Sequence, residues 1–258
     1  LTPKVWGQFP VKQASCMIGG EFRVADFRDA RSTAIATPDA TVTSGDIRVA
    51  DTGAADIDIK RSLDSGTPVL DWTPADGEDL VVGPQIVFDM SAGRPWAFEC
   101  RISDADASAN SVFAGLVSLN GGGATTFDGY TVAYIQIDGG TLYTNRSMVG
   151  FQAAESASVY GVVKDRGTAD ANGYQVSGSS TAIKSGATMS AVATMADDTF
   201  VKLGLYSDGK VIRWFVDNSE VANLAMGSTE LPSGDYDSSM VPVVALNAAG
   251  TTLMQVDW

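Results

Sequence analysis

Short runs in which apolar and polar residues alternate recur along the chain, and they end at Gly, Asp, Asn or Pro. The strictest run is Pro95–Ile102, in which Trp96, Phe98, Cys100 and Ile102 fall on one face of an extended chain. A period of two is typical of a half-buried strand, and helical periodicity is scarce. Gly accounts for 27 of 258 residues. The sequence therefore predicts an all-β fold of short strands joined by turns, either a sandwich or a barrel.

The pattern predicts one domain preceded by an arm. Residues 1–20 alternate little and are expected to form an extended N-terminal arm, followed by a sandwich over 21–258 whose pattern is strongest over 80–258. Residues 28–45 and 62–79 are expected to be loops, which places Trp72 in a loop. Strands are expected, in chain order, over 21–27, 45–49, 55–60, 80–90, 95–102, 111–117, 129–137, 159–163, 200–206, 211–217, 221–226, 240–246 and 252–258.

Composition narrows the classes of function. Lys and Arg number 17 against 31 Asp and Glu, so the net charge is −14, which argues against binding nucleic acid or an anionic membrane. The chain has no His, which removes Ser-His-Asp and Cys-His catalysis and nearly all zinc sites. Cys16 and Cys100 are either two buried thiols or a disulfide pair, and the sequence leaves both alternatives open. No signal peptide and no run long enough to span a membrane is expected.

Several segments together resemble a known family. The strand at Pro95–Ile102, the Asp208-Gly209 hairpin leading into Val211–Asp217, and the strands at Met240–Val244 and Gln255–Trp258 are similar to those of concanavalin A-like jelly rolls. The resemblance implies an all-β, two-sheet antiparallel β-sandwich, the fold of legume lectins, laminin G modules and some glycosidases and polysaccharide lyases. More narrowly, the order resembles domains of tailed-phage head decoration and fibre proteins.

The resemblance implies a non-enzymatic virion protein that decorates a phage head, assembled in the host cytoplasm. Its implied partners are the major capsid protein and further copies of itself in a homo-oligomer. The arm residues Trp6, Phe9 and Met17 are the candidates for docking on the capsid. Packing of the arm against its own sandwich is an equal alternative.

The alternative function is carbohydrate binding, with surface glycans as the partner. Tyr130 and Tyr134 share one strand face, and Glu99 and Arg101 lie opposite the apolar face of their strand. A glycosidase is the remote third hypothesis. It needs two carboxylates, and Glu99 has no partner Glu at the spacing that this fold's hydrolases use.

One loop offers oxygen ligands at alternate positions. Asp104, Asp106 and Asn110 could wrap a calcium ion, and the loop over 165–173 is similar in composition. Asp and Asn are also favoured in turns for their own backbone hydrogen bonds, which is the competing interpretation. Apart from possible calcium, no cofactor is expected.

Overall fold

The computed structural model describes the sandwich in segments. They are residues 41–44, 47–51, 56–61, 68–74, 77, 79–84, 88–89, 95–118, 147–164, 174–177, 181–184, 191–225 and 239–257. Every regular element in these segments is a β-strand, and none of them contains a helix that could cross a membrane. The all-β prediction is confirmed.

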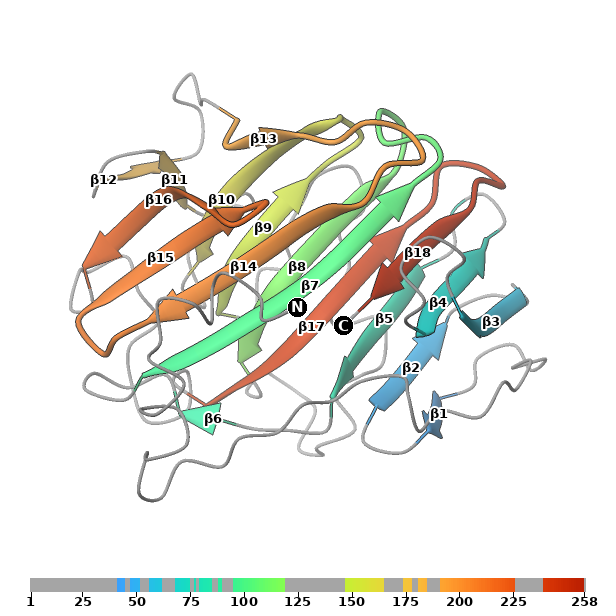
Figure 1. The fold of residues 1–258 in the computed structure, drawn as a ribbon, viewed down its shortest axis with the longest axis horizontal. Helices are drawn as coiled ribbons and strands as arrows, with labels where there is room; N and C mark the ends of the chain where they lie inside the picture. The colour runs from blue at the N-terminus through green and yellow to red at the C-terminus, as the bar shows by residue number, and fades with distance from the viewer. Residues whose placement is uncertain are drawn as a thin grey trace.

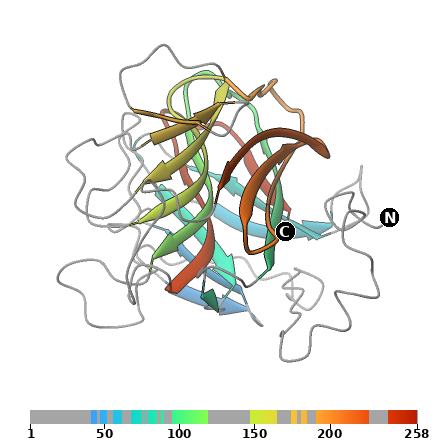
Figure 2. The same cartoon turned by 90° about the vertical axis from the view of Figure 1, so that its left-hand side faces the viewer.

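The strands form two antiparallel sheets that lie as two layers (Figures 1 and 2). The small sheet has the order β16 (Ser219–Ala225), β15 (Val211–Val216), β14 (Val201–Ser207), β7 (Trp96–Asp104), β18 (Met254–Asp257), β4 (Pro68–Thr73) and β3 (Asp56–Arg61). The main path of the large sheet is β1 (Thr41–Ser44), β2 (Ile47–Asp51), β5 (Asp79–Pro84), β17 (Ser239–Asn247), β8 (Ser111–Ser118), β9 (Met148–Ala153), β10 (Ser158–Lys164), β11 (Tyr174–Ser177) and β12 (Thr181–Lys184). Off this path, β6 (Phe88–Asp89) pairs with β17 and β13 (Ala193–Thr194) pairs with β10.

The last two strands lie inside the sheets and not at their edges. β17 lies between β5 and β8 in the large sheet, and β18 lies between β4 and β7 in the small one. In each sheet, one of the last two strands therefore lies between an early strand and a strand from the middle of the chain. This confirms the prediction that the C-terminal segments are built into the sheets.

Alternation in β7 sorts its side chains as predicted. Trp96, Phe98, Cys100 and Ile102 are buried against the large sheet, and the residues between them are half-buried on the outer face. The main core therefore fills the space between the two sheets. Cys100 is buried in this core, and Cys16, the other cysteine of the chain, lies outside the described residues.

The large sheet is apolar on both faces. Besides the residues that it gives to the main core, its outer face carries a second cluster in which every member is at least 95 % buried: Phe113, Val117, Met148, Val162, Val241, Val243 and Ala245. Continuous burial on both sides explains why β8 and β9 read as apolar runs and not as alternating strands.

Four local predictions were wrong, and the cause is the same. Residues 41–44, which belong to the expected loop over 28–45, form β1. Residues 68–73 form β4, with Trp72 fully buried, where a loop was expected. β9 and the β11–β12 hairpin were not predicted at all. Pairing with neighbouring strands overrides weak local signals in such short segments.

Trp214 joins the two sheets by a hydrogen bond through the core. Its Nε1–H donates to the carbonyl oxygen of Gly150 on β9, at 2.7 Å, and the ring is fully buried. Beside this bond, β8 and β9 approach closely at the register pair Gly115 and Gly150. A Cβ on Gly115 would lie 2.5 Å from the Gly150 Cα, and a Cβ on Gly150 would collide with the Ala114 carbonyl oxygen.

Trp214→Phe is expected to destabilise the fold more than Trp72→Phe, by about 1–3 kcal/mol. Both indoles are fully buried, so the loss of ring volume is matched. Within the described part of the chain, Trp72 Nε1 has no hydrogen-bond partner to lose. Urea denaturation of the two variants measures the difference, and equal losses would contradict a stabilising role for the Trp214 bond.

Gly150→Ala and Gly115→Ala are each expected to lower the free energy of unfolding by about 1–3 kcal/mol, because the added methyl group must push two paired strands apart. Gly250→Ala is the matched control, since a Cβ there meets nothing within 4 Å. Chemical denaturation of the three variants is the measurement. A Gly150 variant as stable as the Gly250 variant would show that the close approach is not a constraint.

Candidate functional site

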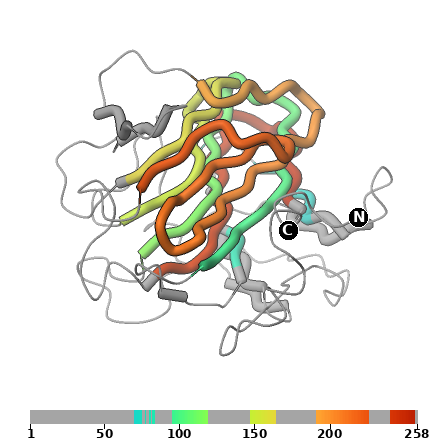
Figure 3. The backbone as a smooth tube through the Cα atoms, turned by 60° about the vertical axis from the view of Figure 1, so that its left-hand side comes forward, coloured from blue at the N-terminus to red at the C-terminus, as the bar shows by residue number. Residues whose placement is uncertain are grey.

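The outer face of the small sheet is the polar sheet face among the described residues. Glu99, Arg101, Lys202 and Arg213 are half-buried there, whereas the large sheet presents its second apolar cluster outward. A sheet face on which charged groups keep partial access to water can recognise a polar ligand, and an apolar buried one cannot. The search for a site therefore concentrates on β7, β14, β15 and β16, which Figure 3 shows side by side.

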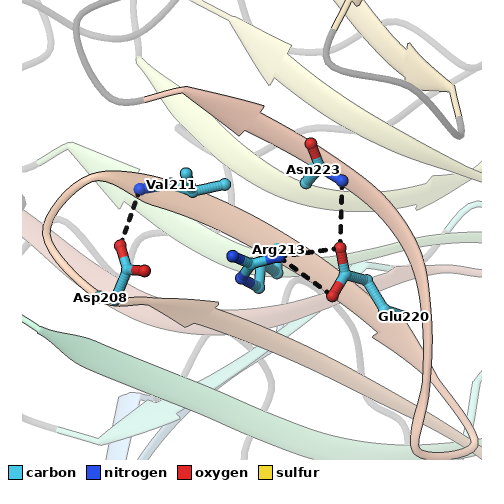
Figure 4. A network of polar contacts seen from close by, with 5 residues as sticks. All are labelled: Asp208, Val211, Arg213, Glu220 and Asn223. Carbon is cyan, nitrogen blue, oxygen red and sulfur yellow. Dashed lines mark hydrogen bonds and ion pairs between the residues drawn. The ribbon is translucent and has the colours of Figure 1, made fainter.

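Four side chains gather on β14, β15 and β16; Tyr206, Arg213, Glu220 and Asn223 are called the Arg213 cluster below. Arg213 Nη1 donates to both Glu220 oxygens, at 3.1 and 3.2 Å, and Asn223 Nδ2 donates to Glu220 Oε1 at 3.0 Å (Figure 4). Tyr206 lies directly opposite Arg213 in the β14–β15 register. The Arg213 and Glu220 side chains are 30 % and 32 % exposed, so the cluster is held in place yet open to solvent.

Turn chemistry and a bulge bring the cluster together. Gly209 takes φ 84° in the hairpin before β15, and Asp217 and Asn218 take φ 46° and 71° in the turn after it. The β15–β16 register shifts between Trp214 and Phe215, so that β16 carries one extra residue there. That extra residue lets Glu220 and Asn223, three apart in sequence, face the same side.

Glu99 and Arg101 lie on this face as predicted, and both are engaged. Lys202 Nζ lies 3.2 Å from Glu99 Oε1, with both side chains below one-fifth exposed. The guanidinium of Arg101 lies over the ring of Phe200, 5.2 Å from its centre. These contacts make a second polar group next to the Arg213 cluster.

Two carboxylates of this face, Glu99 and Glu220, are far apart and each is paired with a cation, whereas Asp71 on β4 accepts from Gln255 Nε2 at 2.7 Å. The outward positions of β7 hold one carboxylate, Glu99, with Arg101 two residues further on. Glu220 lies three strands away in the same row, about 14 Å at the usual strand spacing. Glycosidases place their two carboxyl groups about 5–9.5 Å apart. Glu99 and Glu220 are therefore too far apart to act as such a pair, whereas Asp71 on β4 stands directly opposite Asp58 on β3 in the strand register.

Two of the predicted calcium ligands, Asp106 and Asn110, are engaged in hydrogen bonds within the described residues. Asn110 uses both ends of its amide internally: Nδ2 donates to Asp104 Oδ1 at 2.7 Å and to Thr252 Oγ1 at 2.9 Å, and Oδ1 accepts from the Ala249 N–H at 2.9 Å. Asp106 accepts from the Ser108 hydroxyl at 2.9 Å. Turn chemistry therefore describes Asn110 better than metal binding. The predicted loop over 165–173 lies outside the described residues.

Asp104 is the buried acid of this loop, at 1 % exposed. Burial raises the pKa of its carboxyl above the ordinary value, against hydrogen bonds from the Asp106 N–H and Asn110 that lower it. The negative charges of Asp106 and Asp197 raise it further. In the described segments, no three His, Cys, Asp or Glu side chains are gathered so as to hold a metal ion.

Other predicted site residues lie outside the described segments: Trp6, Phe9, Met17, Tyr130 and Tyr134. The sequence analysis missed Tyr206, Arg213, Glu220 and Asn223. A signal was available, since Tyr206 and Arg213 stand at outward positions on either side of the predicted Asp208-Gly209 turn. The bulge that turns Glu220 toward them left no mark in the sequence pattern.

Asp208 should make the hairpin beneath the cluster acid-sensitive. Its Oδ1 accepts from the Lys210 and Val211 N–H groups, at 2.8 and 2.9 Å. Partial burial opposes the effect, but these bonds and the charge of Arg213 lower the pKa of Asp208 below 3.8. Because the pKa of Asp208 is lower in the folded state, its ionised carboxylate stabilises the fold at pH values above the pKa of the unfolded state. This stabilisation is lost as the pH falls through the pKa of the folded state.

The stability difference between the wild type and Asp208→Ala is therefore expected to be constant above about pH 5 and to shrink toward about pH 2. Urea denaturation at a series of pH values measures it. Asp208→Asn keeps an acceptor oxygen without the charge, so its difference from Asp208→Ala should not vary with pH. A wild-type advantage over Asp208→Ala that persisted unchanged in acid would contradict the role assigned to the charge.

Comparison with known proteins identifies the fold. No family model and no curated protein sequence matches the chain. The potassium-bound carbohydrate recognition domain of Emp46p is similar in structure, with a TM-score of 0.50, 13 % identity, and coverage of 82 % of this chain and 85 % of that one. The endo-β-1,4-glucuronan lyase of the fungus Trichoderma reesei gives a TM-score of 0.46 at 8 % identity, covering 88 % and 91 % of the two chains. The laminarinase catalytic domain of Thermotoga petrophila gives 0.44 at 11 %, covering 78 % and 77 %. The fold is a concanavalin A-like jelly roll, as the strand pattern predicted.

Proposed function

We propose that the chain binds carbohydrate, without cleaving it, on the outer face of the small sheet. The observation that carries this proposal is the Arg213 cluster. It combines an aromatic ring, a guanidinium, an amide and a carboxylate on adjacent strands, and its charged pair is about one-third exposed.

These groups match the chemistry of a sugar ring. The apolar face of a pyranose stacks on an aromatic side chain such as Tyr206, while its hydroxyls act as donors and acceptors at once. Arg213 and Asn223 offer donors and Glu220 offers acceptors, and their mutual hydrogen bonds fix their positions before a ligand arrives. Preorganisation of this kind reduces the entropy lost on binding.

The likeness to the Emp46p carbohydrate recognition domain supports the proposal at the level of fold. Fold alone does not decide function, because this sandwich serves many functions. The choice of binding over hydrolysis rests on the carboxylates. Glu99 is paired with Lys202 and Glu220 with Arg213, and their separation of about 14 Å exceeds the distance of about 5–9.5 Å between the two carboxyl groups of glycosidases.

The test is calorimetric titration with a panel of neutral and uronic-acid oligosaccharides. We expect the wild type to bind at least one member, and Tyr206→Ala and Arg213→Ala each to weaken that binding about tenfold. Each variant removes a group that contacts the sugar directly. Asn223→Ala, on β16, is the milder third variant should either of the others fail to fold.

Lys210→Ala is the matched control, because Lys210 is exposed on the same hairpin but outside the cluster. Its affinity should equal that of the wild type. Failure to bind any member of the panel, or wild-type affinity in the Tyr206 and Arg213 variants, would contradict the proposed site. Release of reducing sugar that Glu99→Gln abolishes would contradict the non-catalytic part.

Attachment to a phage head stays a prediction from the family resemblance. It rests on Trp6, Phe9 and Met17 in the arm, which lies outside the described residues. The two roles are compatible, because the arm and the sheet face are different parts of the chain. Mass spectrometry of purified virus particles tests the attachment separately from glycan binding.

A further inference from the structure

Charged side chains on the candidate face balance one another. The described residues of β7, β14, β15 and β16, with the two turns between β14 and β16, contain four cations and four carboxylates apart from Asp104, which is buried at the end of β7. The cations are Arg101, Lys202, Lys210 and Arg213; the carboxylates are Glu99, Asp208, Asp217 and Glu220. The face is therefore neutral, in a chain whose net charge is −14. Anionic ligands are attracted by an excess of positive charge, which the described residues of this face do not provide.

Arg213 keeps hydrogen-bond donors for a ligand although it is paired with Glu220. Both of its bonds to Glu220 leave from one nitrogen, Nη1, at 3.1 and 3.2 Å (Figure 4). Within the described segments, its Nε and Nη2 have no hydrogen-bond partner, and the side chain is 30 % exposed. A guanidinium has five N–H donors in a fixed plane, so this edge can still bind oxygen atoms of a ligand.

Acceptors lie beside these donors. Asn223 Nδ2 donates to Glu220 Oε1 at 3.0 Å, which leaves Asn223 Oδ1 without a partner in the described part of the chain. A carboxylate has about four lone-pair sites, so Glu220 also keeps acceptor capacity. A sugar hydroxyl donates one hydrogen bond and accepts others, so it can use the donors and the acceptors together. A carboxylate on the ligand only accepts, and it would leave the acceptors of Glu220 and Asn223 unmatched.

The charge of Glu220 acts in the same direction. A uronic acid differs from its neutral parent sugar at carbon 6, where a carboxylate replaces the hydroxymethyl group. A ligand carboxylate bound to Arg213 would lie close to Glu220, because both Glu220 oxygens are within 3.2 Å of the same guanidinium. Like charges brought together across an interface repel, and proteins use such repulsion to reject the wrong partner.

We propose that Glu220 makes the Arg213 cluster selective for neutral sugars and excludes uronic acids. This inference rests on the proposed function, because it assumes that a glycan occupies the cluster. Glu220 holds Arg213 in position, offers acceptors that only a hydroxyl can use, and repels a carboxylate. It is therefore the residue that determines specificity at this site.

The test is calorimetric titration with pairs of oligosaccharides that differ only at carbon 6: oligomers of glucose and glucuronic acid, of galactose and galacturonic acid, and of mannose and mannuronic acid. We expect the wild type to bind the neutral member of a pair at least about tenfold more tightly than the acidic member. Glu220→Gln keeps the shape of the side chain and removes its charge. The preference should then fall to about twofold or less through tighter binding of the acidic member, whereas a merely structural role would weaken both members equally.

Glu155→Gln is the matched control, because it makes the same chemical change at an exposed position in the turn between β9 and β10, on the other sheet. Its preference should equal that of the wild type. Should Glu220→Gln fail to fold, salt tests the repulsion in the wild type. Raising sodium chloride from about 20 mM to about 500 mM should tighten binding of the acidic member and leave binding of the neutral one unchanged.

The outcomes separate this inference from the proposed function. Wild-type binding of the acidic members that equals or exceeds binding of the neutral ones would overturn the selectivity and leave glycan binding intact. A neutral preference that neither Glu220→Gln nor salt alters would overturn the role of Glu220. Failure of every oligosaccharide to bind would contradict the proposed function, and the inference with it.

Discussion

The hydrogen bond from Trp214 to the Gly150 carbonyl is the interaction on which the packing of the two sheets depends. It spans the core from β15 to β9, and a fully buried indole can reach a strand backbone only where the opposing strands leave room. Gly150 and its register partner Gly115 have no side chains, so β8 and β9 approach closely behind that carbonyl. Sheet separation, core volume and the placement of β15 are therefore set at one point.

The same strand carries the candidate binding face. Alternation along β15 sends Trp214 into the core and Arg213 outward, so the residue that fixes the sheet spacing also fixes the base of the Arg213 cluster. The bulge opposite Trp214 then turns Glu220 toward Arg213. A rigid cluster on a sheet face follows from core packing directly beneath it, which is the arrangement that precise recognition of a small polar ligand needs.

The polar groups at the end of β7 are arranged differently from those on the outer face of the small sheet. Glu99 and Glu220 on the sheet face are each paired with a cation, whereas Asp104 at the end of β7 is buried and its Oδ2 has no hydrogen-bond partner within the described segments. The first arrangement is neutral and open to solvent; the second is negative and partly buried.

The sequence by itself determined what depends on neighbours along the chain: the β class, the inward face of β7 and the Asp208-Gly209 hairpin. Alternation and turn chemistry depend on residues that are close together in the sequence, so they can be recognised without the structure. Only the tertiary structure decided that Trp72 is in a strand, that the Asn110 amide is engaged in hydrogen bonds, and that Asp197 accepts from the Ala107 N–H. These features depend on strand pairing and on loop contacts between residues tens of positions apart in the sequence. No local sequence pattern indicates such contacts.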